Sequence, residues 1–186
     1  MQTVTGLFIT NRAARSAVNS LEEEGIASSD IAYVGREEPG DAHSDAATGA
    51  GAGAGAVAGG AGGLLAGLGI LAIPGVGPVV AAGWLAATLA GAAAGAVVGG
   101  VAGRLVGALV DAGVDKDDAG VYAEGIRRGG AIVSVTGVEE KHAEAVRSIL
   151  VSNGAVDLQN QRTLYEGEGW SLTDEGNRDR GSEPKK

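Results

Sequence analysis

The sequence predicts an α+β fold in which a long helical insertion interrupts a small sheet unit, and three observations lead to this prediction. Strand–helix–strand patterns occupy both ends of the chain, at residues 1–35 and 115–161. Between them, residues 46–103 carry no charged side chain and have glycine at every fourth position over long stretches. The last residues, 166–186, are polar and glycine-rich, which predicts a flexible tail.

The N-terminal zone, residues 1–35, predicts a strand, a helix and a second strand. Residues 3–9 are apolar and β-branched, and residues 31–34 form another apolar run, as is typical of strands. The residues between these runs bring apolar side chains to one face at helical spacing. Asn11 can cap the start of that helix, and Gly25 lies where a C-terminal cap belongs.

The C-terminal zone, residues 115–161, repeats this order. The expected elements are a short helix capped by Asp115, a strand at residues 131–136, a helix at residues 139–152 and a final strand at residues 155–159. Gly129-Gly130 and Asn153-Gly154 end the two helices. Two strand–helix–strand units together make a ferredoxin-like β-α-β-β-α-β sheet, and its apolar face would receive both helices.

The middle of the chain, residues 46–113, predicts a helical hairpin. Two prolines flank glycines in the stretch Pro74-Gly75-Val76-Gly77-Pro78, and this composition predicts a turn through which neither arm can continue as a helix. Glycine recurs at a spacing of four in both arms, which draws a stripe along one face of a helix. The glycines of the two stripes are Gly51, Gly55, Gly59, Gly63, Gly67, Gly91, Gly95, Gly99, Gly103 and Gly107.

A glycine stripe allows a second backbone to approach closely, as between the helices of membrane proteins. We therefore expect an antiparallel glycine-zipper hairpin inserted into the ferredoxin-like unit. Because a helix without polar residues needs cover on every side, three arrangements follow: the hairpin packs against other copies of the chain, it enters a membrane, or the sheet and tail of one monomer cover it. Each arm exceeds the roughly 20 residues of a membrane span, but the first arm is mostly glycine and alanine, which insert poorly.

Composition argues against several classes of function. The formal net charge of −9 disfavours nucleic acid, because phosphate neutralisation requires clustered basic side chains, and it disfavours electrostatic docking on anionic lipid. The absence of cysteine excludes disulfides and thiolate chemistry. The first residues lack the basic and apolar regions of a secretory signal, so we expect a cytoplasmic protein.

No pattern of residues predicts an active site. His43 and His142 have no ligand spacing around them, and the aspartates at positions 111–118 lack the order of a calcium loop; helix capping explains them better. Arg127-Arg128 precedes two glycines and could bind an anion, but a solvated pair at a helix C-terminus is the simpler interpretation. We therefore predict no catalytic residue, no cofactor and no metal.

Three stretches of the sequence resemble a known family. They are Thr-Val-Thr-Gly-Leu-Phe at residues 3–8, Ala-Ile-Pro-Gly-Val-Gly-Pro-Val-Val-Ala-Ala-Gly at residues 72–83, and Tyr-Ala-Glu-Gly-Ile-Arg-Arg-Gly-Gly at residues 122–130. Together they are similar to the bacterial general stress proteins, known as heat-induced or low-temperature-induced stress proteins. The resemblance covers about residues 1–161 and implies a stress-linked, non-enzymatic role, and it supplies no catalytic residues.

From these observations we expect a structural protein whose partner is itself, in a homo-oligomer held together by the hairpins. The alternative is a stress protein whose hairpin enters the cytoplasmic membrane, with membrane lipid as its partner. A small-molecule sensor is a third possibility, by analogy with other ferredoxin-like sheets alone. In the tail, Trp170 and Leu172 are the apolar points, and we expect Trp170 to be mobile and not docked.

Overall fold

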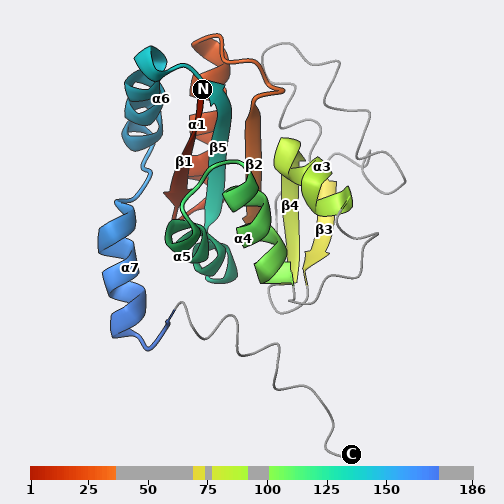
Figure 1. Ribbon diagram of the computed structural model, residues 1–186, viewed down its shortest axis with the longest axis vertical. Helices are drawn as coiled ribbons and strands as arrows, with labels where there is room; N and C mark the ends of the chain where they lie inside the picture. Colours follow the sequence, from red (N-terminus) through yellow and green to blue (C-terminus); the bar gives the residue numbers. More distant parts are fainter. Residues whose placement is uncertain (37–68, 74–76, 92–100, 172–186) are drawn as a thin grey trace, which may run out of the picture.

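A computed structural model describes residues 1–36, 69–73, 77–91 and 101–171 of the chain (Figure 1). Its elements are β1 (Gln2–Phe8), α1 (Asn11–Glu23), β2 (Ile31–Arg36), β3 (Gly69–Ile73), β4 (Gly77–Gly83), α3 (Trp84–Gly91), α4 (Val101–Asp111), α5 (Lys116–Arg127), β5 (Ala131–Val138), α6 (Glu140–Ser152) and α7 (Leu158–Gly167). The described strands form one antiparallel sheet in the order β1-β5-β2-β4-β3. The prediction of a mixed fold of helices and an antiparallel sheet is confirmed.

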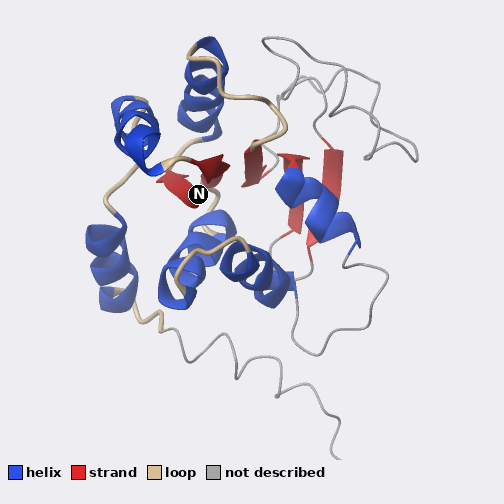
Figure 2. Cartoon of the chain, turned by 45° about the horizontal axis from the view of Figure 1, so that its top comes forward, coloured by secondary structure: helices blue, strands red, loops and turns tan. Residues whose placement is uncertain are grey.

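Helices cover both faces of this sheet (Figure 2). Successive strand side chains point to opposite faces, so Phe8, Tyr33 and Val133 pack on the face that α1 and α6 cover. Their neighbours Leu7 and Ile132 pack on the face that α3, α4 and α5 cover. We call these the first and the second face. Because both faces are buried, the inner strands β2 and β5 are largely apolar, with the buried Ser134 of β5 as a polar exception.

Several helices begin and end at the capping residues and glycines that the sequence predicts. Asp115 caps α5, and its side chain accepts a hydrogen bond from the backbone N–H of Asp117 at 2.9 Å. Gly25, Gly129 and Gly154 follow α1, α5 and α6 with positive φ angles of 87°, 94° and 97°, which glycine adopts without steric cost. These predictions are confirmed.

The predicted cap of α1 is wrong. Thr10 caps this helix, and its side chain accepts the bond from the N–H of Ala13. Asn11 begins the helix with a side chain only 2% exposed, which donates to the carbonyl oxygen of Arg36 at 2.6 Å and accepts from the Tyr33 hydroxyl at 3.2 Å. A buried amide needs such partners. Because the Asn11 side chain lies beside Tyr33, it bonds to the sheet and does not cap the helix.

The predicted last strand, residues 155–159, is also wrong. After α6 the chain passes the outer side of β1 and makes one backbone hydrogen bond there, from Val156 N–H to Leu7 O at 2.8 Å. It then enters α7, which Asp157 caps by accepting a bond from the N–H of Asn160. The cap stops strand pairing after a single bond, because the residues that would extend it become helical.

The chain reverses direction between Ile73 and Gly77, within the region of the predicted turn, but it does so between two strands. β3 and β4 pair antiparallel on either side of this reversal, from Gly69 opposite Ala81 to Ile73 opposite Gly77. β4 also pairs with β2, so residues expected to form helix arms instead extend the sheet. The prediction of a helical hairpin is wrong next to the turn, and α3 and α4 are the helices that the structure describes in this region.

The predicted tail begins too early. Glu166 and Gly167 belong to α7, and Trp170 is 4% exposed against Val121 and Tyr165. The expectation of an undocked Trp170 is therefore wrong, and residues 172–186 lie outside the described part. Within the described residues no helix is long and apolar enough to cross a membrane.

Candidate functional site

The glycines predicted to mediate self-association and the residues predicted to form the hairpin turn fall into two groups. Most of them lie outside the described residues, namely Gly51, Gly55, Gly59, Gly63, Gly67, Gly95, Gly99, Pro74 and Gly75. Of the others, Gly77 and Pro78 begin β4, Gly91 ends α3, and Gly103 and Gly107 belong to α4. The described residues thus place only the last two glycines of the second stripe on one helix.

Helix α4 presents these glycines on the side that faces away from the sheet. Its buried side chains, Leu105 and Leu109, pack on the second face, and a rotation of 100° per residue puts Gly103 and Gly107 on the opposite side. A Cβ atom on either glycine would meet no other atom of the described chain within 4 Å. Val110, which shares this side, is 38% exposed.

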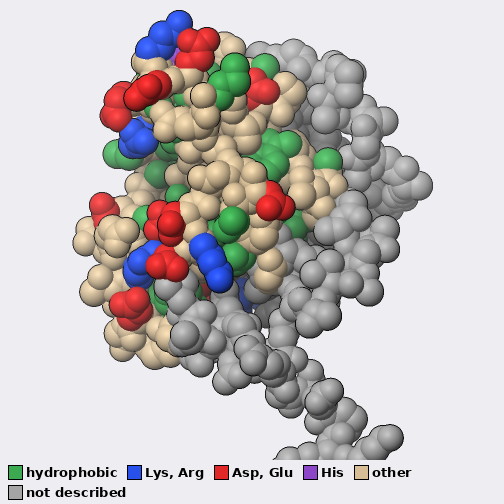
Figure 3. All heavy atoms as spheres, in the orientation of Figure 1, with side chains coloured by type: hydrophobic (Ala, Val, Ile, Leu, Met, Phe, Trp, Pro, Cys, Tyr) green, Lys and Arg blue, Asp and Glu red, His purple; other side chains and the backbone are tan. Residues whose placement is uncertain are grey.

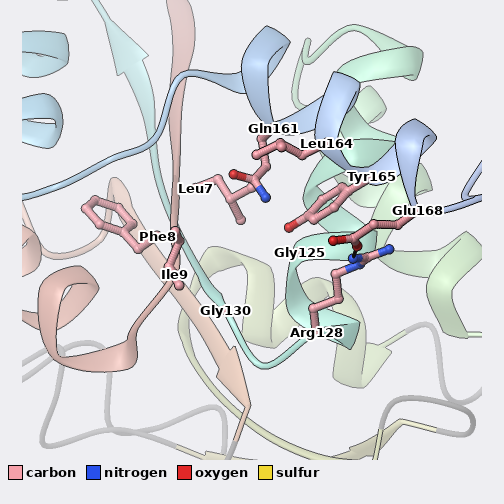
Figure 4. Close-up of a pocket in the computed structure, with 10 residues that line it drawn as sticks. All are labelled: Leu7, Phe8, Ile9, Gly125, Arg128, Gly130, Gln161, Leu164, Tyr165 and Glu168. Atoms are coloured by element: carbon pink, nitrogen blue, oxygen red, sulfur yellow. Dashed lines mark hydrogen bonds and ion pairs between the residues drawn. The ribbon is translucent and has the colours of Figure 1, made fainter.

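A second candidate is a shallow cleft of about 200 Å³ between the end of β1, α5 and α7 (Figure 4). Leu7, Phe8 and Ile9 line one wall, and residues of α7 line the other. Two exposed apolar side chains stand at its rim, Ile9 at 67% and Leu164 at 59%. The cleft is narrow because Gly125 and Gly130 allow close backbone approach; a Cβ on Gly130 would lie 2.6 Å from Phe8 O.

The polar end of the cleft is an ion-pair cluster around Glu124. This carboxylate is 5% exposed and accepts hydrogen bonds from Arg127 and from Arg128, the latter at 2.7 Å. Arg128 also pairs with Glu168 of α7, and its guanidinium lies 4.1 Å from the centre of the Tyr165 ring. Burial by itself lowers the pKa of Arg128, but its hydrogen bonds to Glu124 and Glu168 outweigh this and raise the pKa.

This cluster corrects the interpretation of Arg127-Arg128. The two side chains are 29% and 33% exposed and are held by carboxylates, so they are not a solvated pair. An anion in the cleft would compete with Glu124 and Glu168 for Arg128. The arrangement therefore serves mainly to fasten α7 onto α5.

Two further contacts fasten α7. Arg162 pairs with Asp118 of α5 at 3.0 Å. Tyr165 and Trp170, whose rings meet edge-on with centroids 6.1 Å apart and an interplanar angle of 74°, pack together against Val121 of α5. Figure 3 shows charged side chains over α6 and α7 and further ones toward the middle of the molecule, over α4 and α5.

Little in the described residues has the character of a catalytic group. They contain no group of three or more His, Asp or Glu side chains placed to hold a metal ion, and His142 is exposed on α6. Burial raises the pKa of the Tyr122 hydroxyl, which donates to Thr5 O at 2.8 Å. Tyr122 therefore acts as a hydrogen-bond donor over a wide range of pH.

The sequence interpretation missed Glu124, helix α7 and the hydroxyl of Tyr122, and it wrongly left Trp170 undocked. A signal for α7 exists in Asp157, a capping residue, followed by Leu158 and Tyr165 seven residues apart on one helical face. For Glu124 the only signal is the spacing of three and four residues to the two arginines. Such spacing marks an ion pair but does not show that the carboxylate is buried.

The chain matches no protein-family model, no curated protein and no solved structure at a significant level.

Proposed function

We propose that this protein is a non-enzymatic structural protein that self-associates through its glycine-rich middle into a homo-oligomer. The observation that carries the proposal is the outward side of α4. A surface helix normally presents polar side chains there, whereas α4 presents Gly103, Gly107 and the exposed Val110. A second helix could approach this surface to within backbone contact.

The same proposal includes a ferredoxin-like origin for the sheet. In that fold the third strand of the unit lies between the first and the second. Here β1, β2 and β5 are the first, second and third strands, and β5 lies between β1 and β2. The single bond from Val156 to Leu7 lies where a fourth strand would pair with β1. The hairpin of β3 and β4 then extends the sheet beyond β2.

The second arm of the middle region supports association over membrane insertion. Its apolar residues Val79, Val80, Leu85 and Leu89 are at most 6% exposed within the protein core. They cannot face lipid unless β4 and α3 leave this core. The stress-linked part of the proposal rests on the sequence resemblance to the general stress proteins.

The experiment compares oligomer size by size-exclusion chromatography with light scattering. Gly107→Leu fills the open surface of α4 and should shift the protein to smaller species, while Gly107→Ala should have a weaker effect. Gly167→Leu is the matched control, because this glycine in α7 also has open space around it but lies outside the middle region. A monomeric parent protein, or a Gly107→Leu variant that assembles as the parent does, would refute the proposal.

A further inference from the structure

Strand β1 is the outermost strand of the described sheet on its side, since it pairs only with β5 there. Leu7 O accepts a hydrogen bond from outside the sheet, from Val156 N–H, so this carbonyl points away from β5. In an antiparallel ladder every second residue has the same orientation. The carbonyl of Thr5 therefore also points outward from the sheet.

The carbonyl of Thr5 is occupied by a side chain. The hydroxyl of Tyr122, on α5, donates to Thr5 O at 2.8 Å across 117 positions of sequence. Tyr122 is 6% exposed, so packing on the second face holds the hydroxyl in place. The two outward carbonyls at the centre of β1 are thus both used, one by a hydroxyl and one by a single N–H, and neither bond belongs to a neighbouring strand.

The sequence of β1 itself carries little protection against pairing. Edge strands are usually kept from pairing by charged side chains, by proline, by bulges or by a covering helix or loop, and here the end of α6 and the chain after it cover β1, because a Cβ on Gly6 would lie 3.2 Å from Ala155 Cβ and 3.4 Å from Leu150 Cβ. Gln2–Phe8 contains no charged residue and no proline, and its one irregularity of register lies between Gln2 and Val4, near the start. A strand of this kind, once uncovered, can add to another strand edge.

We propose that Tyr122 and Val156 are edge caps that prevent β1 from pairing with the β1 strand of a second copy of this chain. The partner is a second copy because identical edges can pair antiparallel about a two-fold axis, with Thr5 opposite Thr5 and each Leu7 near the other Thr3. The uncharged edge places no like charges opposite each other, although the chain as a whole carries a net charge of −9. This inference does not depend on association through α4.

Tyr122→Phe tests the proposal, because it removes the hydroxyl and keeps the ring in the core. The variant is made together with Gly107→Leu, so that association through α4 does not obscure the result. We expect an association constant roughly one hundred times larger than that of Gly107→Leu alone, because the substitution frees one Thr5 carbonyl in each copy and a Thr5–Thr5 pair exchanges two inter-strand hydrogen bonds, each worth about a factor of ten. Sedimentation velocity over a range of concentrations measures it, and hydrogen exchange should show slower exchange of the amides of residues 3–7 in the associated form.

Tyr165→Phe is the matched control, since it removes a hydroxyl from α7 and leaves β1 unchanged. Val156→Pro removes the second cap, the N–H bonded to Leu7, and decides the question should Tyr122→Phe fail to fold. Association that is no stronger in either cap variant than in the control overturns the proposal. Stronger association without slower exchange at residues 3–7 overturns it as well, because the new contact would then lie elsewhere.

Discussion

Helices α1 and α4 lie on opposite faces of the sheet and differ in what they present to solvent. On each helix we compare three residues that point away from the sheet, the second four positions after the first and the third three positions after the second. In α1 these positions hold Arg12, Ser16 and Asn19, all exposed, and in α4 they hold Gly103, Gly107 and Val110. Both helices nevertheless bury apolar side chains on their inward side, with exposed fractions of 0% in α1 and of at most 5% in α4.

The comparison separates two requirements that surface helices usually meet together. Packing on the sheet needs only an inward apolar side, and α1 and α4 both have one. Solubility favours an outward polar side; α1 has one, whereas in α4 this side holds Gly103, Gly107 and Val110, with the exposed Asp111 at the end of the helix. The helix α1 on the first face therefore has a polar outer side, whereas α4 on the second face presents the glycines on which the proposed association rests.

The largest expected effects test whether the two faces form one folding unit. Phe8 on the first face and Leu109 on the second are both 0% exposed. Phe8→Ala should lower the free energy of unfolding by about 3–5 kcal/mol, and Leu109→Ala by about 2–5 kcal/mol. Urea denaturation followed by circular dichroism measures both changes, and we expect one cooperative transition in each variant. A loss below about 1 kcal/mol for Leu109→Ala would mean that α4 adds little to the core.

A smaller loss of stability is expected at two glycines with positive φ, Gly83 before α3 on the second face and Gly25 after α1 on the first face. Gly83, between β4 and α3, has a φ of 75°, and a Cβ there would collide with Ile31 O and lie 2.9 Å from Ala32 Cα. Gly83→Ala should therefore cost about 2–4 kcal/mol, from backbone strain and overlap together.

Gly25, at the end of α1, is the control for Gly83. Its φ is 87°, but a Cβ there would meet no atom within 4 Å, so Gly25→Ala should cost about 1–2 kcal/mol from strain alone. Thermal and urea unfolding of the two variants compare these costs. Equal losses would show that the junction between β4 and α3 relaxes to admit a side chain.

The smallest expected effect is a pH dependence at Asp118, which pairs with Arg162 of α7. Burial raises the pKa of this carboxyl above its ordinary value of 3.8, and Arg162 partly opposes the rise. The folded protein then binds this proton more tightly than the unfolded chain does, so Asp118 stabilises the fold at low pH and loses that contribution as the pH rises through its folded pKa. Relative to Asp118→Asn, the wild-type free energy of unfolding should fall between about pH 3 and pH 6. A relative rise over this range would show that the ion pair outweighs burial.

Prediction from sequence succeeded where a helix carried its own start, stop and apolar period. Asp115, Gly129 and Gly154 mark the ends of α5 and α6, and each acts through backbone groups within a few residues. In the middle region such signals are missing, because residues 79–83 are apolar without a period. A short apolar run fits a buried strand as well as a helix, and pairing with β2 and β3 decided between them.

The sequence by itself determined the two zones of mixed structure, the chain reversal at residues 74–78 and the helix ends, because these depend on local backbone preferences. Only the tertiary structure decided that β4 joins the sheet, that Glu124 binds two arginines, and that Tyr122 and Trp170 are buried. Tyr122 shows the reason most clearly. Its partner Thr5 is 117 positions away, and such a contact exists only after the strands and helices have packed.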